Sequence, residues 1–150
     1  MENKELFKKA LKFVLAHEGG YVNDPNDRGG ATNKGITQNT YNTYLKSKGK
    51  TTKDVRYITD AEVEDIYYTR YWLTAGCEKM SAKFAVLCFD TAVNMGVGRI
   101  KLFLEEAQYT DIDAFILARI RKYNDFAKVA SQRGFLHGWL NRVFALVDFL

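Results

Sequence analysis

A glutamate at the end of an amphipathic segment is followed at once by a glycine-rich loop that carries two aspartates. Glu18 lies directly before Gly19 and Gly20, and Asp24 and Asp27 follow in the same loop. Two carboxyl groups that flank a sugar can divide the work of glycoside cleavage, one as the acid and the other as nucleophile, base or charge stabiliser. The spacing therefore predicts acid–base chemistry, with Glu18 as the candidate acid.

The element that must position Glu18 is a helix predicted over residues 3–17. Its apolar residues recur at helical spacing, namely Leu6, Phe7, Ala10, Leu11, Val14 and Leu15. One further step of this pattern reaches Glu18, so its side chain is expected to point toward the protein. Burial and the negative end of a helix dipole both favour the protonated form of a carboxyl group, which a general acid needs. The alternative is an ordinary glutamate at a helix end, with its carboxylate in water.

The loop at residues 19–37 contains five glycines and the single proline of the chain. We expect Gly19 and Gly20 to end the preceding helix in the left-handed conformation. The segment from Asp24 to Asp27 predicts a tight turn, so the alternative role of both aspartates is to make that turn. Residues 31–32 and 35–37 predict the two short strands of a hairpin.

This loop resembles the N-terminal signature of glycoside hydrolase family 108. The resemblance rests on Glu18-Gly19-Gly20-Tyr21, on Asn23-Asp24-Pro25 with Asp27, Gly29, Gly30 and Thr32, and on Gly35-Ile36-Thr37. Residues 89–96 and 135–142 are similar to the predicted peptidoglycan-binding region of that family. The resemblance covers nearly the whole chain and implies an N-acetylmuramidase of the phage and bacterial type, with a peptidoglycan-binding C-terminal region.

A more distant similarity to phage-type lysozymes implies roles for individual residues. Those enzymes carry a glutamate at a helix end, an aspartate nine positions later and a threonine before a Gly-Ile pair. The similarity implies that Glu18 is the acid, Asp27 the second carboxylate and Thr32 a hydroxyl that orients water. Asp24 is the alternative to Asp27, and Thr37 is the alternative to Thr32. The position of the second carboxylate on a loop favours an inverting mechanism, in which the two carboxyl groups lie about 6.5–9.5 Å apart.

Aromatic side chains offer faces on which sugar rings can stack. The aromatic candidates are Tyr21, Tyr67, Tyr68, Tyr71 and Trp72. Tyr67, Tyr71 and Trp72 also lie at helical spacing, which is typical of core residues. Asn94 is a polar residue in an apolar helical pattern, and we expect it to bind the loop or an N-acetyl group, or else to be a buried amide. The predicted substrate-binding residues are Tyr21, Asp24, Thr37, Tyr71, Trp72 and Asn94.

The rest of the chain predicts helices. The periodic segments lie near residues 37–49, 60–74, 81–96, 99–108, 111–127 and 135–149, with capping residues at Thr37, Thr59 and Asp111. Together with the small β element near residues 21–37, this predicts a mainly α, lysozyme-like α+β fold in which a helical bundle carries a small hairpin. A chain of 150 residues suits one compact domain. Within it we expect a catalytic lobe at about 1–72 and a peptidoglycan-binding-like helical lobe at about 73–150.

Charge and composition narrow the expected partners. A net charge of +4 and a sequence pI near 9.0 suit an anionic polymer such as the bacterial wall. The sequence has no dense stripe of lysine and arginine, so we expect no nucleic acid partner. Cys77 and Cys88 predict buried free thiols, and no Cys/His spacing is typical of a metal site, so we expect neither metal nor cofactor.

The first residues are charged and amphipathic, which is unlike a secretory signal, and no apolar run is long enough to span a membrane. We therefore expect the protein to be made in the cytoplasm, and we separately expect a monomer. A holin or an export system would release it to the periplasmic or extracellular wall.

These observations predict a peptidoglycan hydrolase that cleaves the β-1,4 bond between N-acetylmuramic acid and N-acetylglucosamine, with Glu18 as general acid. A lytic transglycosylase is an alternative, because it needs one acid/base and forms an anhydro product. A chitinase-type hydrolase would instead cleave chitin oligomers. A non-catalytic wall-binding module would bind sacculi without clearing them, although a carboxylate in a protected register argues against it.

Overall fold

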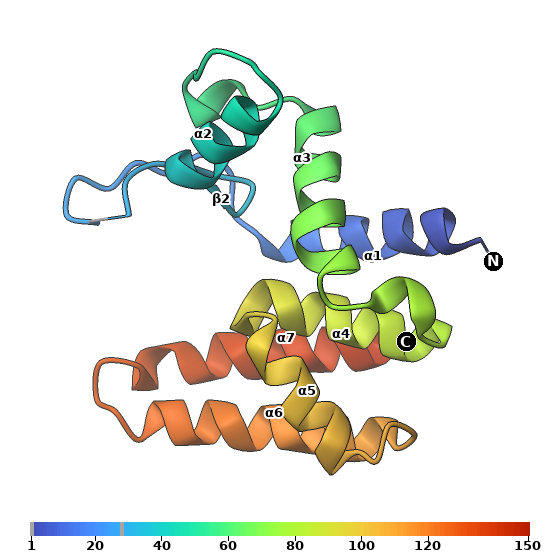
Figure 1. The fold of residues 1–150 in the computed structure, drawn as a ribbon. Helices are drawn as coiled ribbons and strands as arrows, with labels where there is room; N and C mark the ends of the chain where they lie inside the picture. Colours follow the sequence, from blue (N-terminus) through green and yellow to red (C-terminus); the bar gives the residue numbers. More distant parts are fainter. Residues whose placement is uncertain (1, 28) are drawn as a thin grey trace. The chain divides into compact units, whose positions relative to one another are not determined.

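The computed structural model describes residues 2–27 and 29–150. Figure 1 shows helices throughout the chain, with a short hairpin in its first quarter. Two units are distinguished, Met1–Leu73 and Thr74–Leu150, and each is described by itself. The elements of the first unit are α1 (Asn3–His17), β1 (Thr32–Asn33), β2 (Ile36–Thr37), α2 (Gln38–Ser47), η1 (Val55–Tyr57), α3 (Asp60–Tyr67) and the π-helical η2 (Tyr68–Leu73).

Helix α1 and segment η2 of the first unit pack through aromatic rings. Phe7 of α1 meets Tyr68 and Trp72 edge to face, with ring centroids 5.0 and 5.4 Å apart. The Trp72 indole N–H donates a hydrogen bond to Asn3 Oδ1 at 3.0 Å. The end of the helical segment that begins at α3 is therefore fixed against α1, which carries Glu18 at its own end.

The small β element expected near residues 21–37 is confirmed. Strands β1 and β2 pair antiparallel, with Thr32 opposite Thr37, and an isolated bridge joins Val22 to Thr32. Helix α2 begins directly after β2, and Thr37 Oγ1 accepts a hydrogen bond from the Thr40 N–H at 3.1 Å. The loop that follows Glu18 is thus held at both ends, by α1 and by the cap of α2.

Hydrogen bonds tie η1 to the hairpin and fix the start of α3. The Asn33 side-chain amide donates to the carbonyls of Val55 and Arg56, each at 3.2 Å. The capping box expected at Thr59 is present, because Thr59 Oγ1 accepts from the Glu62 N–H while the Glu62 carboxylate accepts from the Thr59 N–H.

The second unit is built around α4. Its elements are η3 (Cys77–Lys79), α4 (Ala82–Met95), α5 (Gly98–Glu106), α6 (Ile112–Ala127), η4 (Arg133–Phe135) and α7 (Leu136–Phe149). Helix α4 is buried at every residue from Phe84 to Ala92, as expected of a helix surrounded by others. Phe115 of α6 packs edge to face on Phe84 and Phe103. The predicted helices are confirmed, with ends that differ by one or a few residues, except that the segment predicted near 60–74 is α-helical to Tyr67 and π-helical from Tyr68 to Leu73.

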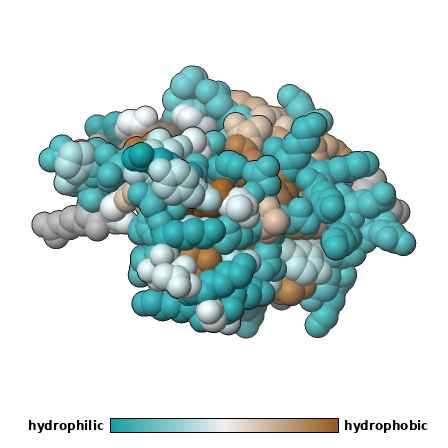
Figure 2. Space-filling model, turned by 90° about the horizontal axis from the view of Figure 1, so that it is seen from above, coloured by the Kyte–Doolittle hydropathy of each residue, from teal (hydrophilic) through white to brown (hydrophobic). Residues whose placement is uncertain are grey.

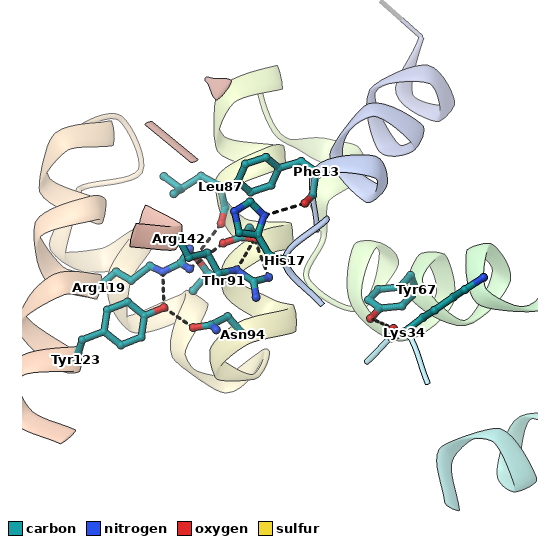
Figure 3. Close-up of polar contacts among 11 residues, drawn as sticks. Phe13, His17, Lys34, Tyr67, Leu87, Thr91, Asn94, Arg119, Tyr123 and Arg142 are labelled. Atoms are coloured by element: carbon teal, nitrogen blue, oxygen red, sulfur yellow. Dashed lines mark hydrogen bonds and ion pairs between the residues drawn. The ribbon is translucent and has the colours of Figure 1, made fainter. Parts of the chain in front are cut away.

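A buried polar network joins α4, α6 and α7. Asp90 of α4 accepts hydrogen bonds from Arg142 Nε and Nη2 at 3.0 and 2.9 Å, and its other oxygen lies 2.7 Å from Arg119 Nη2. Arg119 also donates to the hydroxyls of Thr91 and Tyr123 (Figure 3). A buried carboxylate between two guanidinium groups holds three helices in one register.

Cys77 and Cys88 are buried free thiols, as the sequence predicts. Burial raises the pKa of both thiols, and that of Cys88 reaches about 12. The charge of Cys88 raises the pKa of Cys77 further. Both are therefore neutral thiols at physiological pH.

The mainly helical, lysozyme-like fold class with a two-stranded hairpin is confirmed within the described residues. The face drawn in Figure 2 is mostly hydrophilic. None of the described helices combines the length and the apolar character needed to cross a membrane.

Candidate active site

Glu18 lies immediately after the last residue of α1. Its backbone is extended (φ −92°, ψ 147°), while its N–H still donates to the carbonyls of Val14 and Leu15. Gly19 and Gly20 are not in the left-handed conformation expected of them, because the extended backbone of Glu18 itself turns the chain out of the helix. The Glu18 side chain is half-buried, as its place in the apolar pattern predicts.

The Glu18 carboxyl lies against the backbone of Gly35, in the turn between β1 and β2. A Cβ atom at Gly35 would lie 2.9 Å from Glu18 Oε2 and 2.5 Å from Tyr67 Oη. The Tyr67 hydroxyl donates to the Lys34 carbonyl at 2.7 Å (Figure 3). Glycine therefore leaves the space in which a carboxyl from α1 and a phenol from α3 meet the hairpin.

Tyr71 is the aromatic neighbour of this group. Its ring centroid lies 5.4 Å from that of Tyr67, and its side chain is half-buried. Burial raises the pKa of Tyr71, Arg70 lowers it, and the negative charge of Glu18 raises it again. Tyr71 thus packs on Tyr67, whose hydroxyl borders the same space at Gly35 as the Glu18 carboxyl.

Asp24 and Asp27 are both exposed and both shape the loop. Asp24 Oδ1 accepts from the Asn26 N–H at 2.9 Å, and Asp27 Oδ1 accepts from the Gly29 N–H at 2.8 Å. These are the turn-making bonds that the sequence offered as the alternative for both residues. Their roles as second carboxylate and sugar ligand stay predictions.

The two threonines of the hairpin are half-buried and face each other across the strands. The Thr37 hydroxyl caps α2 and also donates to Thr40 Oγ1 at 3.0 Å. Since this hydroxyl already serves the helix, Thr32 is the better placed of the two for a water-orienting role. That role is a prediction.

Trp72 needs a correction. The ring is fully buried against Phe7, so it offers no face to a sugar, and core packing is the role the structure gives it. Asn94 lies in α4 of the second unit, where its side-chain oxygen accepts a hydrogen bond from the Tyr123 hydroxyl (Figure 3). This bond accounts for a polar residue in an apolar helix, and a contact of Asn94 with substrate stays a prediction.

Arg56 is a neighbour of the site that the sequence did not reveal. Its guanidinium lies over the half-buried ring of Tyr21, with the carbon atom 4.5 Å from the ring centroid. The contact depends on the fold, because η1 is fastened to the hairpin by Asn33, more than 20 residues earlier. Periodicity and spacing within residues 51–57 give no signal of it.

Other features of the described residues lie apart from this site. Of the residues considered as sugar contacts, only Tyr68 lines the hollows between α1 and α3; the hollow that contains it is lined by Lys4, Phe7, Ala61, Glu64, Asp65 and Tyr68. Nowhere in residues 2–27 and 29–150 do three or more His, Cys, Asp or Glu side chains gather as a metal site requires.

A half-buried carboxyl at a helix end, set against a small hairpin in a mainly helical chain, has the layout of a lysozyme-like glycosidase. Residues 11–96 match the family Glycosyl hydrolase 108, and the chain belongs to this family. The match runs from α1 through the loop to the end of α4. The family expectation is confirmed, whereas the peptidoglycan-binding nature of the C-terminal region stays a prediction.

Comparison with solved structures supports the same fold. The structure of SagA from Brucella abortus is 26% identical in sequence and superposes with a TM-score of 0.75, over 95% of this chain and 92% of that one. No curated protein matches the chain. The fold and the glycoside hydrolase family are therefore established by the family match together with this structure.

Proposed function

We propose that this protein is an N-acetylmuramidase that hydrolyses the β-1,4 bond between N-acetylmuramic acid and N-acetylglucosamine in peptidoglycan. Membership of the family supports a peptidoglycan hydrolase. The observation that carries the specific mechanism is the half-buried Glu18 carboxyl, packed on Gly35 next to Tyr67 and within electrostatic reach of Tyr71. Such a carboxyl is shielded from bulk water on one side and is attached to the rigid end of a helix.

In the proposed mechanism Glu18 gives its proton to the glycosidic oxygen as the bond from that oxygen to the sugar C1 breaks. Positive charge then develops on the sugar ring, and a loop carboxylate stabilises it or activates the attacking water. Asp27 is the first candidate for this second role and Asp24 the alternative. Thr32 orients the water, and Tyr21, Thr37 and Tyr71 contact the sugars.

The test is mass spectrometry of the soluble products released from purified sacculi. Wild type is expected to release reducing muropeptides, and borohydride labelling should place the new reducing end on muramic acid. Glu18→Gln is expected to release none while keeping the thermal melting curve of wild type. Glu5→Gln, an exposed change on the same helix, is the matched control and should behave as wild type. A fully active Glu18→Gln protein would remove Glu18 from the mechanism.

The second carboxylate is tested in the same assay. Asp27→Asn should lower the rate of release more than Asp24→Asn, and the reverse order would transfer the role to Asp24. Because each aspartate also holds a backbone N–H of its own loop, the melting curves of both variants are needed beside the rates.

A lytic transglycosylase is the second candidate function. It needs a single acid/base, and the structure engages both loop aspartates in turn-making bonds while Glu18 packs on the hairpin. Anhydro-muramic products in the same mass spectra would assign this activity. Sacculi that bind the protein but release nothing from wild type would instead identify a binding module.

Release to the wall through a holin or an export system, as a monomer, is part of this proposal. The basic net charge of the chain supports an anionic wall polymer as its partner.

A further inference from the structure

Arg56 is an exposed cation that the fold brings to the loop following Glu18. Its guanidinium carbon lies 4.5 Å from the centroid of the Tyr21 ring. Tyr21 is three residues after Glu18, so their Cα atoms are at most about 11 Å apart. Arg56 therefore lies over a residue of the loop that directly follows Glu18, and Tyr21 is itself a predicted sugar contact.

The backbone that carries Arg56 is held firmly. Asn33 of β1 donates to the carbonyls of Val55 and Arg56, and the Val55 N–H donates to Gln38 Oε1 at 2.7 Å. Asp54 caps the turn, with its side-chain oxygen accepting from the Arg56 N–H at 2.8 Å. The position of the guanidinium is thus set by hydrogen bonds to the hairpin and to the start of α2.

Among the residues that the structure describes, the Arg56 guanidinium forms no ion pair that would give it a structural role. Within the described residues no carboxylate oxygen lies within 4.0 Å of it, although Asp54 is close enough to raise its pKa. The largest cause of the raised pKa of Arg56 is the Tyr21 side chain, so the group stays charged. The guanidinium group carries five N–H donors in a planar fork, so contact with the Tyr21 side chain still leaves donors for a planar anion such as a carboxylate.

We propose that Arg56 determines substrate specificity by binding a carboxylate on the muramyl residue of the glycan. This carboxylate belongs either to the lactyl group, where the glycan carries no peptide, or to the stem peptide. The inference rests on the proposed function, since N-acetylglucosamine polymers carry no such group. Arg56, held over Tyr21, then distinguishes an acidic wall glycan from a neutral one in the proposed reaction.

The test compares Arg56→Gln with wild type on soluble glycan strands prepared in two forms, with stem peptides and without them. A portion of each is amidated so that its carboxylates become neutral. Arg56→Gln is expected to raise KM about three- to tenfold on the acidic strands, as an exposed charge-assisted hydrogen bond allows, and to leave kcat nearly unchanged. On the amidated strands the two proteins should have the same KM.

Two further variants make the comparison specific. Arg56→Lys keeps the charge but loses the fork of donors, so its KM on acidic strands should lie between those of wild type and Arg56→Gln. Lys50→Gln removes one exposed charge elsewhere in the same unit and should behave as wild type on every strand. An effect confined to strands with stem peptides assigns the peptide carboxylate. An effect of equal size on peptide-free strands means that Arg56 binds the lactyl carboxylate on those strands.

The inference is overturned if Arg56→Gln has the KM of wild type on acidic strands, or if its loss persists undiminished on amidated strands. Failure of the proposed function has a different signature, since wild type would then release no product from any strand. In that case the affinities of wild type and Arg56→Gln for labelled acidic and amidated strands, measured by fluorescence polarisation, test the role of Arg56. Equal affinity of wild type and Arg56→Gln for the acidic strands would overturn the role of Arg56.

Discussion

Gly35 is the single residue on which the placement of the candidate acid most directly depends. It has φ +76°, and the space its missing side chain leaves is bordered by Glu18 and Tyr67. Two separate demands therefore fall on this position. One is the left-handed backbone of the hairpin turn, and the other is the close approach of a carboxyl and a phenol.

We expect Gly35→Ala to lower the rate of muropeptide release by about 100-fold, because the added methyl group displaces the Glu18 carboxyl by the order of an ångström. Backbone strain at positive φ should also lower the free energy of unfolding by about 1–2 kcal/mol. The measurements are product release from sacculi and urea denaturation.

Gly49→Ala separates these two effects. Gly49 has φ +68°, yet a Cβ atom there meets nothing within 4 Å. This control should show the strain in the unfolding curve and keep full activity. If Gly35→Ala and Gly49→Ala were equally active, the close contact at Gly35 would have no part in catalysis.

At the scale of single elements, the helices follow from sequence better than the site does. The N-caps at Thr37, Thr59 and Asp111 act within one turn of chain, so the local sequence is enough to predict them. The position of Arg56 over Tyr21 depends on a contact between segments more than 30 residues apart. No local spacing encodes such a contact.

Trp72 is a second residue whose role the local sequence does not decide. Its spacing suits both a core residue and a sugar platform, and only the packing of η2 on α1 decides for the core. Gly19 and Gly20 also illustrate this limit of the local sequence, because a glycine pair permits a left-handed helix end but does not require one.

The hydrogen bonds from Tyr41 of α2 to Glu62 of α3 link these two helices, and the stability of this link depends on pH. Burial raises the pKa of Glu62, but the hydrogen bonds from Thr59 and Tyr41, helped by the charge of Lys53, bring it below the ordinary value of 4.5. A carboxyl with a lowered pKa stabilises the fold above its unfolded pKa. This contribution is lost as the pH falls through the lower folded value.

We therefore expect Glu62→Gln to be less stable than wild type at pH 7, with a difference that shrinks below about pH 4. Urea denaturation of both proteins, repeated at steps of about one pH unit between pH 3 and pH 7, measures this difference in the free energy of unfolding. The exposed Glu5→Gln variant should follow the wild-type curve. A difference that stays constant over this range would mean that the charge of Glu62 is not what stabilises the link.

The register of α4, α6 and α7 depends on one buried carboxylate. Asp90→Asn would leave the guanidinium groups of Arg119 and Arg142 without their anion, which should lower the free energy of unfolding by about 3–5 kcal/mol. The exposed Asp148→Asn is the matched control on α7 and should change it by less than about 0.5 kcal/mol. Equal stability of the two variants in urea would show that the network is dispensable.

At the scale of the whole molecule, charge governs the encounter with the wall. The chain carries a net charge of +4, and an anionic polymer attracts it over a distance that salt shortens, from about 10 Å at 0.1 M to about 3 Å at 1 M. We expect the rate of release from sacculi to fall severalfold over this range of ionic strength. Sacculi with amidated carboxylates should show a weaker dependence, and equal salt dependence of both substrates would exclude this attraction.

The two buried thiols have a consequence for the chain in oxidising surroundings. Cys77 and Cys88 both belong to the second unit, and raised pKa values keep them from forming the thiolate that oxidants and alkylating reagents attack. The folded protein should therefore pass between reducing and oxidising compartments without covalent change. The same property means that the rate of thiol labelling should report how often residues 74–150 open far enough to expose the two cysteines.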